Sequence, residues 1–312
     1  MNFEEFVIEW RSDSDCIKTK TSGSTGEPKE ISLPKKFVAE SAVRTNDFFN
    51  IGNDSLLHSC VSPDFIGGKM MAVRSEIAGC GFTWEIPSNR PLENYSPLKE
   101  ITLVAVVPSQ MVYIVNAHNH LPDIKNIIVG GSSINPELRK KIYNSGLNAF
   151  ETYGMTETAS HIALRKISPE ANWFETLGDI WVSLDERGCI VIHFPGWFDV
   201  VTNDIGELKS STEFKVSGRI DNLIITGGRK VNPFVLEEKI SKFIKSPFIV
   251  SSTRDEKWGE KIILKIEGEF NELNEINLMN NLRKDLECWE IPKEIIYYEN
   301  LPKTENGKIK RQ

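Results

Sequence analysis

Short apolar runs that alternate with helix-like segments constrain the fold of this chain more than any other feature. The run ITLVAVV ends at Pro108, and residues 110–116 then follow a helical pattern. NIIVGG is a second strand-like run, and Asn135 with Pro136 forms a helix start after it, because Asn caps helices and Pro suits the first helical position. NAFETYG supplies a third strand. This alternation predicts an α/β layer with a largely parallel sheet, in which ligands collect at the carboxyl ends of the strands.

The character of the sequence changes after Glu157. DIWVSLDERGCIVIHF predicts an antiparallel hairpin with its turn at Asp-Glu-Arg-Gly, and a β-rich subdomain is expected over residues 178–217. The rest of the chain predicts a helix around residues 237–238, strands at 248–251 and 261–267, a helix at 273–287 and a strand at 294–298. We therefore expect a large α/β domain over residues 1–220 and a small α+β domain over residues 221–312.

The composition excludes some classes of function. A chain of 312 residues suggests two domains at about 150 residues each, and 40% hydrophobic with 26% charged residues is typical of a globular protein. The net charge of −7 argues against a nucleic-acid partner, because neutralising phosphates needs a concentrated basic surface. Small molecules are the expected partners.

Cysteine spacing and hydropathy indicate in which cellular compartment the protein is expected. The five cysteines contain no Cys-x-x-Cys pair, so they suggest neither a zinc site nor a disulfide framework, and a reducing compartment fits them. No apolar run approaches the length of about 18 residues that a membrane span needs, and residues 1–10 lack the features of a signal peptide. We expect a cytoplasmic protein without a membrane partner.

The segment TKTSGSTGEPKE, residues 19–30, has the chemistry of a phosphate cradle. Gly23 and Gly26 let the backbone bend and bring its N–H groups close to an anion. Hydroxyl donors and a positive charge come from Ser22, Ser24, Thr25 and Lys29. The spacing is not that of a Walker A loop, and a flexible polar linker is the alternative for such a stretch taken alone.

TSGSTGEPK closely resembles the phosphate loop of the adenylate-forming superfamily, which includes acyl-CoA synthetases, adenylation domains of nonribosomal peptide synthetases and firefly luciferase. The resemblance assigns ATP binding to Thr21, Ser22, Gly23, Ser24, Thr25, Gly26 and Lys29. Four further segments similar to the family's motifs follow in the family's order.

The second segment is TYGMTE, residues 152–157. By resemblance, Tyr153 stacks on adenine beside Gly154, Thr156 contacts the region of the α-phosphate, and Glu157 ligates Mg²⁺. A carboxylate oxygen suits this hard cation, which keeps phosphate oxygens as further ligands. A simple turn after a strand would explain Gly154 but not the Thr-Glu pair.

The third segment, GGSSI, takes the place of a family segment whose backbone borders the adenine and the acyl pocket, which implicates Gly131 and Ser132. A strand end before a helix cap would look the same. The fourth consists of Asp204 and Arg219, spaced as in the family. The resemblance implies that Asp204 accepts hydrogen bonds from the ribose hydroxyls and that Arg219 donates near ribose and phosphate. An Asx turn is the alternative for Asp204.

The fifth segment, LPKTENGKIKR, makes Lys308 the catalytic lysine by resemblance. A positioned ammonium stabilises the negative charge that concentrates on the α-phosphate when a carboxylate attacks it. A solvated basic tail is the alternative. Asp221 matches the family's hinge, about which the small domain turns, and the resemblance makes Gly227 and Gly228 line the pantetheine tunnel.

In the family a long N-terminal region usually precedes the phosphate loop, which begins here at Thr21. Short forms of this kind are most similar to the o-succinylbenzoate–CoA ligases of menaquinone biosynthesis. PDFIGGKMMAVRS resembles their acyl-pocket segment, which assigns the acyl pocket to Phe65, Gly68, Lys69 and Arg74. Phe65 stands where many relatives have histidine, and Glu151 stands where asparagine is common.

o-Succinylbenzoate has two carboxylates, so the one that is not activated needs a charge or water in the pocket. Lys69 or Arg74 can supply that charge, unless both extend to solvent. The resemblance thus predicts an AMP-forming acid–CoA ligase that uses ATP, Mg²⁺ and CoA. An enzyme that loads another acid onto CoA or a carrier protein, and a non-catalytic nucleotide-binding remnant, are the alternatives.

Overall fold

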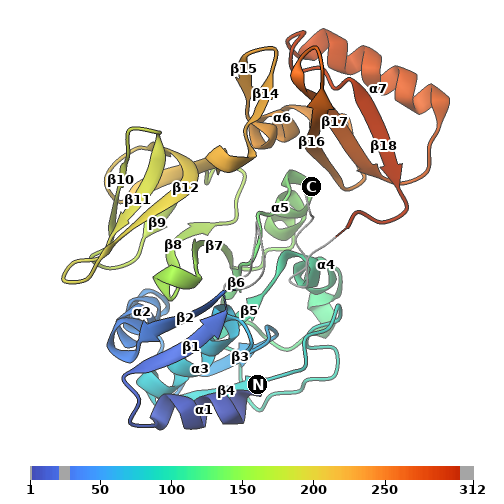
Figure 1. The fold of residues 1–312 in the computed structure, drawn as a ribbon. Coiled ribbons are helices and arrows are strands. Elements are labelled where there is room, and N and C mark those ends of the chain that lie inside the picture. The colour runs from blue at the N-terminus through green and yellow to red at the C-terminus, as the bar shows by residue number, and fades with distance from the viewer. Residues whose placement is uncertain (1, 21–28, 303–312) are drawn as a thin grey trace. The chain divides into compact units, whose positions relative to one another are not determined.

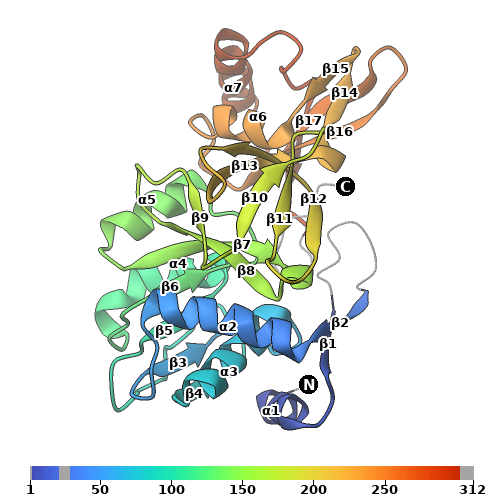
Figure 2. The same ribbon diagram turned by 90° about the vertical axis from the view of Figure 1, so that its left-hand side faces the viewer.

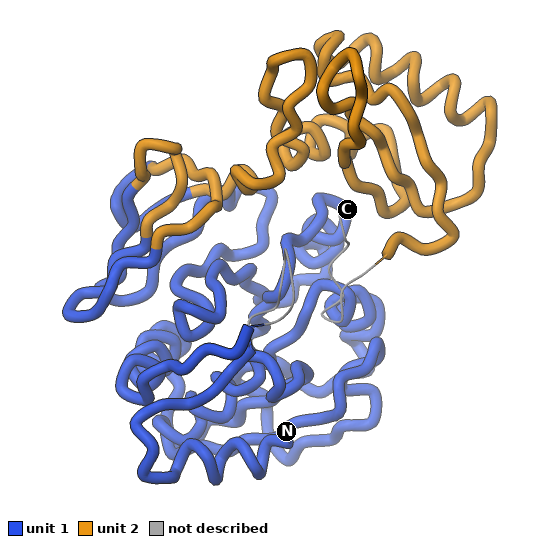
Figure 3. The backbone as a smooth tube through the Cα atoms, in the orientation of Figure 1, with its two compact units in different colours: residues 1–183, 192–200, 209–214 blue, residues 184–191, 201–208, 215–312 orange. Residues whose placement is uncertain are grey.

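The structure is a computed structural model that describes residues 2–20 and 29–302 (Figure 1). The chain forms two compact units (Figure 3). The first comprises residues 1–183, 192–200 and 209–214, and the second comprises residues 184–191, 201–208 and 215–312. No helix in the described part of the chain is long and apolar enough to cross a membrane. The domain boundary between residues 220 and 221 stays a prediction.

Five parallel strands form the centre of the first unit, in the order β7-β6-β5-β3-β4. They are β3 (Leu56–Ser59), β4 (Gly81–Trp84), β5 (Leu103–Val106), β6 (Ile127–Val129) and β7 (Ala149–Met155). Between them run α3 (Ile66–Ala78), α4 (Pro108–Ala117) with the short η1 (His118–His120), and α5 (Pro136–Asn144). Asn135 caps α5 by accepting from the Leu138 amide at 2.7 Å. The predicted alternation of strands and helices is confirmed.

Helices cover both faces of this sheet (Figure 2). Alternate strand residues such as Leu103 and Ala105 share a core with Met71 of α3. Their neighbours Val104 and Val106 share another core with residues of α4 and α5, among them Met111. Because side chains alternate along a strand, a sheet buried on both faces needs uninterrupted apolar runs, which explains the pattern of the sequence.

The N-terminal region forms elements that the sequence analysis did not predict. They are α1 (Phe3–Arg11), β1 (Cys16–Lys20), β2 (Glu30–Pro34) and α2 (Lys35–Phe49). Asn2 and Glu5 form a capping box at the start of α1. β1 and β2 pair antiparallel, and Lys20 opposite Glu30 is the pair nearest the predicted phosphate loop. The loop therefore joins two paired strands.

Antiparallel strands continue the sheet beyond β7 in the order β8-β9-β13-β12-β11-β10. They are β8 (Ser160–Lys166), β9 (Phe174–Thr176), β10 (Trp181–Leu184), β11 (Cys189–His193), β12 (Asp199–Leu208) and β13 (Glu213–Arg219). The predicted hairpin turns at residues 185–188, where Asp185 accepts from the amides of Arg187 and Cys189 and Gly188 has φ +75°. The β-rich subdomain is confirmed.

The second unit contains an α+β fold with its own core. Its elements are η3 (Ile220–Asn222), β14 (Ile224–Thr226), β15 (Arg229–Val231), α6 (Pro233–Ile240), β16 (Phe248–Asp255), β17 (Gly259–Glu267), α7 (Glu272–Asp285) and β18 (Glu294–Tyr298). The strand order is β15-β14-β17-β16, and β18 pairs parallel to β17. Leu236, Leu264 and Leu282 lie in the core between helices and sheet. The helices and strands predicted for the tail are confirmed.

Candidate nucleotide and acyl site

Two of the predicted segments lie side by side at the carboxyl ends of β6 and β7. A Cβ on Gly130 would lie 2.7 Å from Oγ1 of Thr152, and Gly131 has φ +88°. Gly130 is therefore required because Thr152 lies too close for a side chain, and Gly131 because its backbone has a positive φ angle. Ser132 lies exposed directly after them. This edge of a parallel sheet is where α/β proteins bind ligands.

The TYGMTE segment makes a tight turn that returns as β8. A Cβ on Gly154 would lie 2.1 Å from the carbonyl oxygen of Ser160, and the pairing of β7 with β8 shifts register between Tyr153 and Gly154. Thr158, in η2 (Thr156–Thr158), fixes the turn: its Oγ1 donates to the Ser160 carbonyl at 2.6 Å and accepts from the Met155 amide at 2.9 Å. The sequence analysis missed this role of Thr158.

The turn gives the three predicted contact residues different exposures. Thr156 is buried, Glu157 is exposed and Tyr153 is half-buried. The Tyr153 ring packs edge-on against Phe214, with ring centroids 5.1 Å apart. Glu157 is thus an accessible oxygen donor of the kind that Mg²⁺ prefers, so the site fits that ion.

Glu151 connects the two segments and is a site residue that the sequence analysis did not identify. It is buried, yet its carboxylate accepts from Arg139 of α5, from Nη2 of Arg165 of β8 at 2.6 Å, and from the Ile134 amide at 3.3 Å. Two arginines from different elements therefore neutralise one buried carboxylate, and a backbone amide adds a third hydrogen bond. The carboxylate holds the GGSSI turn against β7, and the sequence shows no signal for it because the two arginines lie 12 and 14 positions away.

Arg74 of α3 is fully buried and has no counter-charge among the residues that the structure describes. Its Nη1 contacts the Met71 sulfur at 3.5 Å, whereas its Nε and Nη2 atoms have no hydrogen-bond partner among residues 2–20 and 29–302. Burial lowers the pKa of this guanidinium to about 9. A charge buried without a partner is costly, so the surroundings of Arg74 favour an anion.

The neighbours of Arg74 place it beneath the TYGMTE turn. His161 is paired with Gly154 across the sheet, and its Nε2 lies 3.0 Å from Oγ1 of Thr45. Burial, and then the charge of Arg74, lower the pKa of His161 well below its usual value, so this imidazole is neutral. Asn46 donates to the Arg74 carbonyl at 2.9 Å. None of these contacts supplies a negative charge.

Lys69 differs from Arg74, although it lies on the same helix. Its Nζ donates to the Lys18 carbonyl of β1 at 2.5 Å and lies 5.0 Å from the ring centroid of Phe6 of α1. Burial lowers its pKa, while neighbouring carboxylates act in the opposite direction. Lys69 thus ties α3 to the N-terminal elements, and of the two cations considered for the second carboxylate, Arg74 has the unsatisfied donors.

Phe65 and Gly68 lie at the start of α3, where Phe65 is the residue before the first turn. A Cβ on Gly68 would lie 2.2 Å from the carbonyl oxygen of Ser62, so only glycine lets the helix approach the preceding loop this closely. Their role in an acyl pocket stays a prediction.

In the second unit, three predicted residues meet in one cluster. Arg219 donates to Asp221 through Nε at 3.0 Å and Nη2 at 2.7 Å, and through Nη1 to Asp204 at 3.3 Å. The hydrogen bonds from Arg219 lower the pKa of Asp221. Asp204 is buried. Asp204 and Arg219 are spaced along the sequence as in the family, and the structure shows that their side chains are in contact.

Gly227 and Gly228 form the turn between β14 and β15. Their φ angles are +55° and +76°, and Thr226 pairs with Arg229 across the turn, as in a two-residue hairpin. A Cβ on Gly227 would lie 2.9 Å from the Trp258 ring. The turn is a sufficient reason for both glycines, and the pantetheine tunnel stays a prediction.

Some predicted site residues lie outside the described part of the chain. They are Thr21, Ser22, Gly23, Ser24, Thr25, Gly26 and Lys308. Lys29 is described and exposed, directly before β2.

A parallel sheet covered on both faces, with glycine turns and an exposed carboxylate at its carboxyl edge, defines an α/β protein that binds a nucleotide. The chain matches the AMP-binding enzyme family over residues 13–182, which is more than half of its length. It belongs to that family. The predicted membership of the adenylate-forming superfamily is confirmed.

The chain is similar to three known proteins over almost all of its length. The 2-succinylbenzoate–CoA ligase of Listeria monocytogenes is 29% identical, over 98% of this chain and 71% of the relative. The structure of an acyl-CoA synthetase (AMP-forming)/AMP-acid ligase II-like protein from Dyadobacter fermentans is 29% identical, with a TM-score of 0.65 over 98% of this chain and 91% of that one. The o-succinylbenzoate coenzyme A synthetase of Bacillus subtilis, in complex with ATP and magnesium, shares the fold at 20% identity, with a TM-score of 0.78 over 94% of this chain and 68% of that one.

Proposed function

We propose that the chain is an AMP-forming acid–CoA ligase whose acid is o-succinylbenzoate. Membership of the AMP-binding enzyme family supports the reaction class, and the name of the Listeria relative supports the acid and the acceptor. The Bacillus synthetase was solved with ATP and magnesium, which supports these two as co-substrate and metal.

In the proposed reaction, the acid's carboxylate attacks the α-phosphate of ATP, which yields acyl-AMP and pyrophosphate. The thiol of CoA then displaces AMP. Lys308 stabilises the charge that develops on the α-phosphate, and Glu157 would hold Mg²⁺, which would supply further positive charge. Tyr153 offers its ring to adenine, and Thr156 contacts the α-phosphate from the same turn. Asp204 and Arg219 bind the ribose, and the Ser22–Lys29 segment holds the phosphates.

The environment of Arg74 is the observation that supports o-succinylbenzoate as the substrate. A buried guanidinium with two unpartnered nitrogens is stabilised by a ligand that brings a carboxylate. o-Succinylbenzoate has a carboxylate to spare after the other one has been adenylated. A monocarboxylic acid would leave Arg74 uncompensated, so the pocket discriminates against it.

ATP–pyrophosphate exchange with a panel of acids tests the proposal. We expect exchange with o-succinylbenzoate, and thioester formation with free CoA. Exchange that leads to product only with a carrier protein would instead favour the carrier-loading enzyme. Absence of exchange with every acid would favour the nucleotide-binding remnant. Exchange that is retained in Lys308→Ala contradicts the assigned role of Lys308.

A pair of variants separates the reaction class from the substrate. Arg74→Met is expected to raise KM for o-succinylbenzoate by about 10- to 100-fold, the value of a charge-assisted hydrogen bond. It should leave KM unchanged for the analogue in which the second carboxylate is a methyl ester. Lys69→Met is the matched control and should keep the preference for the diacid. An equal effect of Arg74→Met on both acids would contradict the role of Arg74 in specificity.

A further inference from the structure

A His, a Cys and a Glu lie together at the carboxyl ends of β3 and β4. They are His58 within β3, Cys60 directly after it and Glu85 directly after β4, and their ligand atoms all lie within 4.8 Å of one another. The two strands are parallel neighbours, and the Glu85 amide donates to the Ser59 carbonyl at 3.2 Å. This register brings Glu85 beside Cys60. Among the described residues, no other three or more His, Cys, Asp and Glu side chains meet so closely.

The cluster is separate from the candidate acyl site. Cys60 belongs to the core that α4 and α5 share with the sheet, and His58 points to the same face because side chains two positions apart do so. Leu57 points to the opposite face, where it shares a core with Met71 of the helix that carries Arg74. The proposed adenylation assigns no role to any of the three residues of the cluster.

His58 is held with one ring nitrogen engaged and the other directed at the cluster. Its Nδ1 lies 2.9 Å from Oγ1 of Thr83, which also contacts the Tyr95 hydroxyl at 2.7 Å and donates to the Leu57 carbonyl at 3.4 Å. These contacts are satisfied when Nδ1 carries the proton, which leaves the lone pair on Nε2. The ring packs against Tyr95 at an interplanar angle of 32°, with centroids 4.4 Å apart.

The Nε2 atom of His58 is buried and has no hydrogen-bond partner in the part of the chain that the structure describes. Its distance to Oε2 of Glu85 is 3.9 Å, which is too long for a hydrogen bond. Burial lowers the pKa of His58 to about 4, so the imidazole is neutral. A buried polar atom without a partner calls for an explanation. An ion bound by both His58 and Glu85 would provide that partner.

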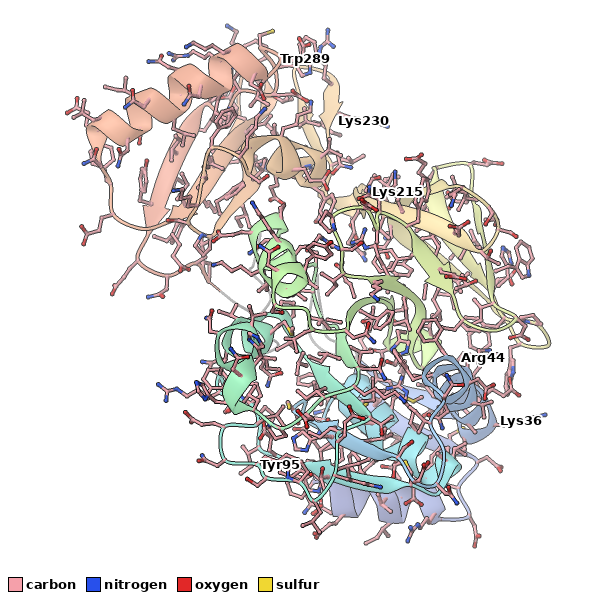
Figure 4. The ribbon with its side chains drawn as sticks, turned by 180° about the vertical axis from the view of Figure 1, so that it is seen from behind. Lys36, Arg44, Tyr95, Lys215, Lys230 and Trp289 are labelled. Carbon is pink, nitrogen blue, oxygen red and sulfur yellow. The ribbon has the colours of Figure 1, made fainter. Side chains whose placement is uncertain are left out.

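Glu85 links the cluster to solvent. Both of its carboxylate oxygens lie 3.1 Å from the Leu92 amide, which orients the side chain, and 22% of the side chain remains exposed. Glu85 and Tyr95 also line a surface pocket of about 670 Å³ formed by residues 85–95. Figure 4 marks Tyr95 in this part of the first unit. Glu85 thus extends from the buried cluster to the surface.

We propose that His58 Nε2, Cys60 Sγ and one Glu85 oxygen bind a zinc ion, with a water molecule from the pocket as fourth ligand. Nitrogen, thiolate sulfur and carboxylate oxygen are the donors that zinc takes, whereas magnesium prefers oxygen alone. Tetrahedral zinc sets its donor atoms about 3.4–3.6 Å apart, so a contraction of about 1 Å from the observed spread forms the site. Thr83 then orients the liganding imidazole from behind, as partners of metal-bound histidines do.

Binding exchanges a proton for the metal. The Cys60 thiol loses its proton to solvent as the sulfur–zinc bond forms, and no other bond changes. Without metal, burial and the Glu85 carboxylate raise the pKa of this thiol, so zinc must compete with that proton. Because the ligands come from two strands, the ion joins the edge strand β4 to β3.

Metal titration of the full-length chain without an affinity tag or nucleotide tests the site. We expect one equivalent of Zn²⁺ to remain bound after dialysis, and Co²⁺ to give a thiolate-to-cobalt charge-transfer band with the intense visible absorption of tetrahedral coordination. The Co²⁺ spectrum of the unaltered chain tests whether a thiolate binds the metal, and it requires no variant. A spectrum without the charge-transfer band, or zinc below stoichiometric amounts, overturns the proposal.

Variants assign the ligands. Cys60→Ser and His58→Gln should each weaken Zn²⁺ affinity at least about 100-fold, and Thr83→Val about 10- to 100-fold. Cys189→Ser removes another buried thiol and should leave Zn²⁺ affinity unchanged, as should Glu157→Gln at the proposed magnesium site. Circular dichroism checks that each variant is folded. Full zinc binding in folded Cys60→Ser, or its loss in Cys189→Ser, contradicts the assignment.

Discussion

Two buried charges near the TYGMTE turn differ in what surrounds them. Glu151 accepts hydrogen bonds from Arg139, Arg165 and the Ile134 amide, so its charge is neutralised within the protein. Arg74 is equally buried, but two of its nitrogens have no partner within the described residues. A buried charge with its own partners stabilises a fixed geometry, whereas one without them is costly until a ligand binds.

Glu151 stabilises the local structure, whereas Arg74 is the residue that we propose to bind the substrate. Glu151 joins α5, β8 and the GGSSI turn, and thereby sets where the Gly130–Gly131 backbone stands beside Thr152. Arg74 instead has two nitrogens without a hydrogen-bond partner among the described residues, and the His161 ring that interacts with it is neutral. Variants at the two positions should therefore have opposite effects on stability.

Glu151→Gln is expected to give the largest effect. It leaves two partly buried guanidinium groups beside an uncharged side chain, and breaking a buried ion pair costs about 3–5 kcal/mol. Chemical denaturation followed by circular dichroism measures the free energy of unfolding. Glu137→Gln is the control, because the Glu137–Lys141 pair is exposed and such pairs contribute about 0.5 kcal/mol. Equal losses in the two variants would mean that Glu151 does not support the turn.

Arg74→Met is expected to give a smaller effect of opposite sign. It removes a desolvated charge and keeps much of the apolar volume, so the free energy of unfolding should stay equal or rise by about 1–3 kcal/mol. The same denaturation experiment checks this in the absence of substrate. A loss of stability comparable with that of Glu151→Gln would show that Arg74 has a partner within the protein and is a structural residue.

Much of the fold was predictable because its determinants are local. Alternating apolar runs predicted the parallel strands, Asn135 predicted the start of α5, and Asp-Glu-Arg-Gly predicted the hairpin turn. The neighbouring GGSSI and TYGMTE segments followed, since consecutive parallel strands end at the same edge of the sheet. The elements before residue 50 were missed, because α1, β1 and β2 are short and the loop between the strands dominates that stretch.

The buried charges were not predictable in the same way. Sequence analysis left Arg74 either in a pocket or extended to solvent, because an arginine on an apolar helix allows both. Its burial depends on α2 and β8, which pack on α3 from distant parts of the sequence. From the sequence, Glu151 was notable only because asparagine is common at this position in the family. The positions of His58, Cys60 and Glu85 do not follow the spacing of a known metal-binding motif. In each case the surroundings of the side chain come from other strands and helices.

The pH dependence of stability gives the smallest expected effect and tests whether Arg74 and His161 interact. The pKa of His161 is lowered in the folded chain, so on acidification below about 6.5 the unfolded chain takes up a proton that the folded chain does not. Stability should therefore fall with pH from about 6.5 down to the lowered folded pKa. Denaturation at a series of pH values should show a flatter slope for His161→Gln, which lacks the titrating ring. In Arg74→Met the fall should end at a higher pH than in the unaltered chain, because burial still lowers the His161 pKa while the repulsion from Arg74 is gone. A fall that ends at the same pH in both chains would mean that the guanidinium charge is already neutralised, and it would remove the reason for placing a substrate carboxylate beside it.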